Sequence, residues 1–346
     1  MDKIDKPTIN DIARLAGVSK TTVSFAFNRP ERVSKATYDK IMKISEELCF
    51  SPDPGARSLV TKKKNSIGLL LPEITPEGFK NPFLFQVLQG MRMGCVEHGQ
   101  SLKIISPPSD DLVSAVRSAI VDGIVIFGMI KKPELFDFIQ RSKLPVVSFD
   151  GGVLNTIPSI TSDDFSGGKQ VMDYVLQQGH RKIAILSFKD AEEYRNDYSH
   201  SAGFRRLEGY ESALKEYGLS LSNPDIHVIP CDECSVEGGY SAISNLWYSG
   251  TQPTAVVAMS DIIAIGVYSF CKDKKIRIPD TLSVAGYDDI FDSSLISPEL
   301  TTVKQKAIDK GKTACQVLIR LINGENNIEP VLFDTKLIIR HSVAKI

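Results

Sequence analysis

From Ser66 onward, short apolar runs alternate with amphipathic segments, and this alternation restricts the fold more than any other feature of the sequence. The apolar runs are IGLLL (67–71), LKIIS (102–106), GIVIFG (123–128), PVVSF (145–149), KIAILS (182–187), TAVVAM (254–259) and TLSVAG (281–286). Helical periodicity is found at about 83–98, 133–142, 166–178, 203–217, 237–249, 261–273 and 305–322. Continuous Val and Ile runs separated by helices indicate parallel sheets covered on both faces. Seven or more strands over some 280 residues favour an α/β body of two doubly wound lobes over a single lobe.

Length and charge distribution point to a small head joined to a large body. A chain of 346 residues exceeds one ordinary core, so we expect two or three domains. Residues 1–64 hold 13 Lys and Arg against 8 Asp and Glu, a net charge of +5, and the remaining residues hold 28 against 34, a net charge of −6. A basic head on an acidic body suits a polyanion-binding regulator.

The first residues and the cysteines bear on location and on metal binding. The stretch MDKIDKPTIN lacks the apolar segment of a signal peptide, and no apolar run is long enough to span a bilayer. We therefore expect a cytoplasmic protein without membrane association. Cys231 and Cys234 form a CxxC pair with no second pair and no histidine at zinc-like spacing. Free thiols and no metal site are expected.

The stretch TINDIARLAGVSKTTVSFAFN, residues 8–28, has the pattern of two short helices joined by a tight turn. Thr8 and Asp11 form a capping-box pair that predicts a helix beginning at Ile9. Gly17 supplies a left-handed residue at the end of this helix, and Ser19 can cap the next one.

A second helix is predicted to begin at Lys20. Its buried side is expected to hold Val23, Ala26 and Phe27, and its outward side Thr21, Phe25 and Asn28. A third helix, capped by Ser34 and with apolar residues from Tyr38 to Leu48, completes an all-α head of residues 1–50. This helix-turn-helix arrangement presents its second helix to the DNA major groove. An ordinary helical hairpin in a small bundle has the same spacing, so that alternative stays open.

The residue identities in this stretch add a resemblance to a known family. TINDIARLAGVSKTTVS closely resembles the N-terminal signature of LacI/GalR-family transcription regulators, and the resemblance continues through FSPDPGARSL and covers nearly the whole chain. It implies that the head binds operator DNA. The residues expected to contact DNA are Thr8, Ser19, Lys20, Thr21, Thr22, Ser24, Phe25 and Asn28.

Residues 51–65 are predicted to link head and body. Asp53 and Pro54 could start a short helix, GARSLVT, which at about seven residues is marginal alone in water, so a flexible linker is the alternative. The resemblance implies a hinge helix that orders on DNA and pairs with its partner in the dimer. In that case Arg57 contacts DNA and Leu59 wedges into the minor groove.

Polar residues gather where the predicted strands end, which is where open parallel sheets bind ligands. Asp150, Asp261 and Asp288 each follow one apolar run, and Arg206 lies near the start of the helix after 182–187. Three carboxylates and an arginine at one edge could hold paired hydroxyls through bidentate contacts. Acids at strand ends are more often helix caps, and Asp261 could be only that.

The segments NPFLFQVLQGM, RRLEGYESAL, PTAVVAMSDIIAIG, LSVAGYDD and PELTTVKQ resemble the family's effector-binding core, a fold like that of periplasmic sugar-binding proteins. The resemblance implies ligand contacts at Phe83, Asp150, Arg206, Asp261 and Asp288, with a sugar or sugar derivative as the default effector. It implies a body of residues 66–346 in which the chain crosses between lobes three times. The first lobe would then span about 66–163 and 295–330, and the second about 164–294 and 331–346, so that PVLFDTKLIIRHSV belongs to the second. Near Cys234 the aromatic residue of several relatives is missing, and the segment from Ser106 to Asp122 is shorter than usual.

Catalysis has little support in the sequence. Gly311, Lys312 and Thr313 look like the end of a phosphate-binding loop, but Lys306 stands where that motif needs glycine. The sequence has no GxGxxG after a strand, no nucleophile elbow and no HExxH, so we expect neither an enzyme nor a cofactor.

We therefore expect a homodimeric repressor controlled by a small ligand, with an approximately palindromic operator. A secreted solute-binding protein is the alternative, because the body alone would fit one. Phe25 stands where many relatives have a hydrogen-bonding residue. Its predicted contact is a thymine methyl group, with Lys20 and Thr21 reading the neighbouring bases. The alternative is that Phe25 folds back onto the head as a surface apolar residue.

Overall fold

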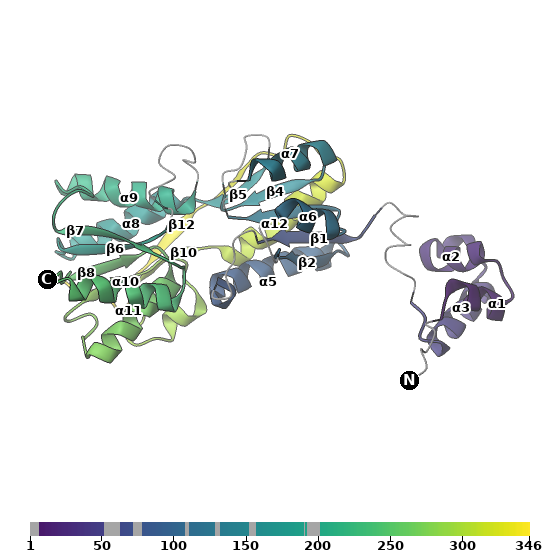
Figure 1. Ribbon diagram of the computed structural model, residues 1–346, viewed down its shortest axis with the longest axis horizontal. Coiled ribbons are helices and arrows are strands. Elements are labelled where there is room, and N and C mark those ends of the chain that lie inside the picture. The colour runs from purple at the N-terminus through teal and green to yellow at the C-terminus, as the bar shows by residue number, and fades with distance from the viewer. Residues whose placement is uncertain are drawn as a thin grey trace. The chain divides into compact units, whose positions relative to one another are not determined.

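Figure 1 shows the computed structural model, which describes residues 7–51, 63–71, 78–107, 111–128, 132–151, 157–189, 191 and 201–346. The chain separates into two compact units, Met1–Asn65 and Ser66–Ile346. No helix in the described ranges is long and apolar enough to cross a membrane. The predicted hinge helix, with Arg57 and Leu59, lies outside the described residues.

The head consists of α1 (Ile9–Ala16), α2 (Lys20–Asn28), the 3₁₀ turn η1 (Pro30–Arg32) and α3 (Lys35–Glu47). The predicted helix starts at Ile9 and Lys20 are confirmed. The core of the head is formed by Ile12, Ala13, Ala16, Val23, Ala26 and Ile41, with Phe27 packed against it. The apolar side predicted for the second helix therefore faces α1 and α3.

Short-range hydrogen bonds fix where these helices begin and end. The Asp11 carboxylate accepts hydrogen bonds from the Thr8 amide at 3.0 Å and the Thr8 hydroxyl at 2.7 Å, and these bonds lower the pKa of Asp11. Ser19 Oγ accepts from the Thr22 amide at 3.1 Å at the start of α2. Gly17 has φ of 71°, the left-handed conformation that ends α1.

The first lobe contains a six-stranded parallel sheet in the order β11-β5-β4-β3-β1-β2. Its strands are β1 (Ser66–Leu70), β2 (Ser101–Ile105), β3 (Gly123–Phe127), β4 (Val146–Phe149), β5 (Ser159–Ser162) and β11 (Val331–Phe333). One face packs with Ile67 and Val125 against α5 (Pro82–Glu97) and α12 (Ala307–Ile322). The other packs with Leu70 and Ile124 against α6 (Leu112–Ser118) and α7 (Pro133–Ser142). The central strands β1, β3 and β4 are buried on both faces, as continuous apolar strands require, whereas the edge strands β2 and β11 are partly exposed.

The second lobe repeats this plan with four parallel strands in the order β7-β6-β8-β9. The strands are β6 (Ile183–Phe188), β7 (Ile226–Cys231), β8 (Ala255–Ala258) and β9 (Ser283–Ala285). Figure 1 shows α8 (Asp164–Gln177) and α9 (Ala202–Glu216) on one face, and α10 (Val236–Tyr248) and α11 (Asp261–Lys274) on the other. Ile185 packs toward the first pair and Leu186 toward the second.

The last part of the chain differs from the prediction. β10 (Thr302–Gln305) pairs antiparallel with β12 (Thr335–Ile338), whereas β11 pairs in parallel with β5 of the first sheet. Assigning the whole of PVLFDTKLIIRHSV to the second lobe is therefore wrong for Val331–Phe333. The physical reason is that Asp334 separates two three- to four-residue strands that hydrogen-bond to different partners.

Two glycines bring α5 and α12 into backbone contact. A Cβ atom on Gly90 would lie 1.9 Å from the carbonyl oxygen of Ile308, and a Cβ atom on Gly311 would lie 2.3 Å from the carbonyl oxygen of Val87. No other residue would fit at either position without moving the helices apart.

Candidate DNA-binding face and effector site

The first turn of α2 places several predicted DNA contacts at the surface of the head. Ser19, Lys20 and Thr21 are exposed, and Thr22 and Ser24 are half-buried. Thr8 is exposed at the start of α1. Recognition helices contact base edges with their N-terminal residues, so this exposed turn is suited to that contact.

Phe25 and Asn28 are less exposed than the sequence suggested. Phe25 is half-buried, and the Arg32 guanidinium carbon lies 5.6 Å from the centroid of its ring. Asn28 is also half-buried, and its Nδ2 donates to Ser24 Oγ at 3.4 Å. Both residues are thus partly covered, because η1 folds back beside the last turn of α2, and their outward orientation stays a prediction.

In the first lobe, Asp150 at the end of β4 is paired with a lysine of α12. Lys310 Nζ donates to both carboxylate oxygens of Asp150, at 2.5 and 2.7 Å. It also donates to Ser162 Oγ at 2.8 Å and to Gln305 Oε1 at 3.2 Å. Lys310 is fully buried, and Phe83 lies beside it with its ring centroid 5.8 Å from Nζ. We call Asp150, Ser162 and Lys310 the first-lobe cluster.

In the second lobe, Arg206 of α9 lies between two carboxylates. Its Nε donates to Asp164 Oδ1 at 2.8 Å, its Nη1 lies 3.8 Å from Asp288 Oδ1, and Nη1 also donates to the Met259 carbonyl. The Tyr287 ring covers the guanidinium, 3.7 Å from Cζ. We call Asp164, Arg206 and Asp288 the second-lobe cluster.

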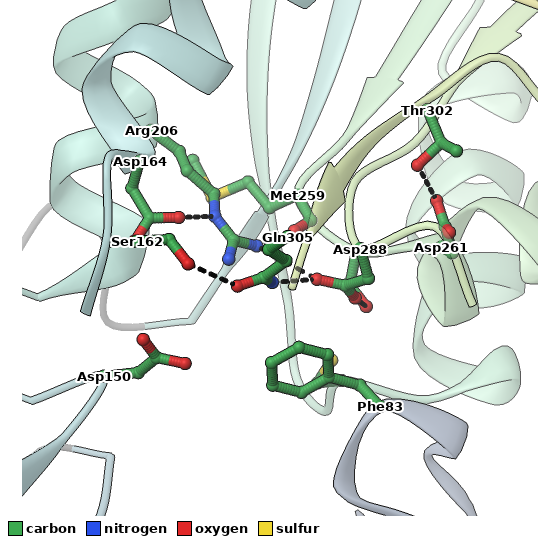
Figure 2. Close-up of polar contacts among 12 residues, drawn as sticks. Phe83, Asp150, Ser162, Asp164, Arg206, Met259, Asp261, Asp288, Thr302 and Gln305 are labelled. Carbon is green, nitrogen blue, oxygen red and sulfur yellow. Dashed lines mark hydrogen bonds and ion pairs between the residues drawn. The ribbon is translucent and has the colours of Figure 1, made fainter. Parts of the chain in front are cut away.

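Gln305, the last residue of β10, links the two clusters (Figure 2). Its Nε2 donates to Asp288 Oδ1, and its Oε1 accepts from Ser162 Oγ at 3.1 Å and from Lys310. A second contact between the lobes joins Asn81 Nδ2 to Cys234 Sγ at 3.7 Å. The structure therefore brings Phe83, Asp150, Arg206 and Asp288 together.

Asp261 does not join this group. Its Oδ1 accepts from the Thr302 hydroxyl at 2.5 Å and its Oδ2 from the Ile290 amide at 3.0 Å, and the residue is completely buried. The two oxygens thus bind the segment before β10, at Ile290, and β10 itself, at Thr302. Among the described residues Asp261 forms no hydrogen bond or ion pair with either cluster, so its ligand contact stays a prediction that this arrangement does not support.

Burial and neighbouring charges shift the acidity of these groups. Burial raises the pKa of Asp288 to about 6, against the opposing effect of Arg206. Burial, together with the negative charge of Asp288, raises the pKa of Asp261 to about 8. Burial also raises the pKa of Asp150, and Lys310 opposes this shift. Desolvation would lower the pKa of Arg206, but Asp164, Tyr287 and Asp288 together outweigh it and the pKa is raised.

The backbone at two of these acids is also unusual. Asp150 has φ of 52° and Asp288 has φ of 127°, both outside the common region for residues with a side chain. Such conformations are found preferentially at ligand sites, where the surrounding fold maintains them. Within the described residues, no group of His, Cys, Asp or Glu is arranged to hold a metal ion.

Sequence reasoning missed five polar residues of the site: Ser162, Asp164, Ser260, Gln305 and Lys310. Ser260 donates to Asp288 Oδ2 at 2.6 Å. A signal was available for Lys310, because it falls on the apolar face of the predicted helix 305–322, between Ala307 and Ala314. A buried lysine at such a position requires a carboxylate partner.

A helix-turn-helix head on a two-lobed body with a polar site between its lobes defines the class of ligand-responsive transcription regulators. Residues 8–53 match the family described as bacterial regulatory proteins, lacI family, and residues 172–343 match the periplasmic binding protein-like domain. The PurR HTH-type transcriptional repressor of Vibrio vulnificus is 31% identical over 353 residues, covering 98% of this chain and 99% of that protein. The chain belongs to the lacI family of bacterial regulatory proteins.

Other relatives and solved structures agree with this assignment. The ribose operon repressor of Haemophilus influenzae is 31% identical over 343 residues, 97% of this chain and 98% of that protein. A CelR transcriptional regulator in complex with cellobiose superposes with a TM-score of 0.70 at 25% identity, over 97% of this chain and 99% of that chain. The lac repressor dimer bound to operator and the anti-inducer ONPF superposes with a TM-score of 0.77 at 24% identity, over 98% of this chain and all of that chain. At this identity the likeness supports the fold alone. The ordinary helical hairpin and the secreted solute-binding protein are both disfavoured by the match over residues 8–53.

Proposed function

We propose that this protein is a homodimeric transcriptional repressor whose operator affinity is set by a small polyhydroxylated ligand, a sugar or sugar derivative, held between the lobes. The observation that carries the proposal is the Gln305 link, because its side chain bonds to both clusters at once. The cellobiose complex and the ribose operon repressor support the class of ligand.

The geometry suggests how a ligand would act. Asp150 and Asp288 are acceptors that belong to different lobes. The present donor to Asp150 is Lys310, and the present donors to Asp288 are Gln305 and Ser260. A sugar hydroxyl that donates to Asp288 in place of Gln305 would break the Gln305 link between the two clusters and replace it with a bond through the ligand. The ligand would thereby set the lobe arrangement, which is the source of a coupling free energy between effector and DNA sites.

The DNA contacts remain a proposal for the individual residues. Lys20 and Thr21 would read base edges, Phe25 a thymine methyl group, and Thr8, Ser19, Thr22, Ser24 and Asn28 would position the head. Arg57 and Leu59 would act from the hinge, with Leu59 opening the minor groove. A twofold dimer presenting two such heads would require an approximately palindromic operator.

We further propose that the protein acts in the cytoplasm, where its operator lies, and that it needs neither a cofactor nor a catalytic step. The proposal follows from the regulator family and from the ion-paired state of every acid in the site. A ligand-binding role requires only that hydrogen bonds be exchanged.

A gel-shift experiment with the full chain and with residues 62–346 tests the function. DNA selected from a random pool should be retarded by the full chain only, and a sugar that raises the melting temperature of both forms should change retardation by the full chain. A protein that binds its ligand equally in both forms and retards no DNA in either would be a solute-binding protein.

A further inference from the structure

Arg32 lies beside the recognition helix and has no role in the function proposed so far. It ends η1, whose backbone is fixed on both sides: the Arg29 amide donates to the Phe25 carbonyl at 2.7 Å, and the Val33 amide donates to the Pro30 carbonyl at 3.1 Å. Val33 packs against the core of the head. The position of the Arg32 backbone relative to α2 is therefore set by the fold.

The Arg32 side chain lies over the face of Phe25, with Cζ 5.6 Å from the ring centroid. Arg32 is exposed, and among the described residues of the head it forms no ion pair with a carboxylate. A guanidinium that stacks on a ring keeps its N–H donors in its own plane, where they are available to another partner.

Phe25 lies one helical turn beyond Thr21, which is exposed in the first turn of α2. A ring at this position can contact a thymine methyl group but cannot hydrogen-bond to a base. Arg32 adds the missing donors, because a guanidinium edge pairs with O6 and N7 of guanine. The separation of 5.6 Å between ring and guanidinium is between one and two base steps of about 3.4 Å each.

We propose that Phe25 and Arg32 form one composite base reader, in which the ring contacts a thymine methyl group and the guanidinium that it supports pairs with a guanine within two base pairs of that thymine in each half-site. The inference rests on the proposed function, since it requires an operator. It adds a specificity-determining residue outside the recognition helix.

The test is selection of binding sites from random DNA by the full chain, followed by affinity measurements on the selected site and on site variants. Wild-type protein should select a palindrome with this thymine and guanine in each half-site. Arg32→Met keeps the apolar stem and removes the donors, so discrimination for guanine should fall by about 5- to 150-fold. Arg29→Met is the matched control, an exposed arginine next to the same turn whose described contacts include no aromatic ring.

Two further measurements separate a base contact from a phosphate contact and a composite reader from an independent arginine. Arg32→Met should leave the salt dependence of binding unchanged, whereas loss of a phosphate contact reduces the slope of log affinity against log salt by about 0.9. Phe25→Leu keeps an apolar side chain but removes the flat support, and it should also lower guanine discrimination. Circular dichroism checks that each variant is folded.

Several outcomes would overturn the inference. The first is full guanine discrimination in Arg32→Met. The second is an equal loss of affinity for all sequences in Arg32→Met, with a reduced salt slope. The third is full guanine discrimination in Phe25→Leu. A wild-type palindrome without the thymine and guanine would overturn it while leaving the repressor function intact. Selection of no palindrome at all would count against the repressor function itself.

Discussion

Removing the ammonium group of Lys310 should strongly destabilise the body, because it leaves Asp150 buried without a cation. Lys310 is fully buried, and the Asp150 side chain retains 10% of its exposure. Among the described residues, Lys310 is the only donor to either oxygen of Asp150. Breaking one side of a buried pair typically costs about 3–5 kcal/mol, and we expect Lys310→Met to lower the free energy of unfolding by that amount.

The stability lost in Lys310→Met should be smaller at acid pH than at neutral pH. Without Lys310, burial, aided by the charge of Asp164 and opposed by that of Arg206, holds the folded-state pKa of Asp150 above the unfolded value. The penalty is then present at neutral pH and disappears as pH falls through the raised pKa, because the protonated acid carries no charge. Urea unfolding of residues 66–346 at about pH 8 and about pH 5 should show a smaller difference between variant and wild type at the lower pH.

Two variants serve as controls for this experiment. Adding Asp150→Asn to Lys310→Met removes the unpaired charge and should restore most of the lost stability. Lys312→Met breaks a partly exposed pair with Glu97, 2.7 Å apart, and should cost less than about 1 kcal/mol. A Lys310→Met protein as stable as wild type at about pH 8, or a double variant no better than the single one, would refute the buried-pair argument.

Three other predictions follow from the site and the head. Arg206→Lys is chosen because alanine would leave Asp164 unpaired. In calorimetry this variant should bind a sugar found by thermal shift about tenfold to a hundredfold more weakly, and unchanged affinity would remove Arg206 from the site. Leu59→Ala should weaken operator binding more than binding to random DNA in gel shifts, and equal losses would make Leu59 a linker residue. Replacing thymine by uracil at the Phe25 position should cost about 1 kcal/mol per half-site in wild type and nothing in Phe25→Ala, and equal binding of both operators by wild type would exclude a methyl contact.

Local signals explain which parts of the fold could be predicted. The helices of the head begin at the predicted residues because their caps lie within four residues of the helix starts. All seven predicted strands are present, since each is a continuous apolar run. β5, β7, β10, β11 and β12 were not predicted, because short strands such as TKLI have no apolar periodicity and depend on partners far away in the sequence.

Strand ends and the family resemblance, which supplied Phe83, marked the part of the candidate site that could be predicted. Asp150 and Asp288 follow apolar runs and were identified, but Asp261 follows one too and its carboxylate is used by Thr302 and Ile290. Lys310 and Gln305 were missed because their partners are set by the return of the chain to the first lobe. A sequence pattern indicates where an acidic residue lies but not which hydrogen-bond donor pairs with its carboxylate.

The backbone contact between α5 and α12 has a mechanical consequence for the site. Gly90 and Gly311 leave no space in which one helix could slide past the other, so α12 must travel with the first lobe as a single rigid body. Lys310 would then keep its bonds to Asp150 when the lobes separate. β10 is hydrogen-bonded to the second lobe beside Asp288. The bonds from Ser162 and Lys310 to Gln305 Oε1, together with the bond from Asn81 to Cys234, are therefore the ones that such a motion would break.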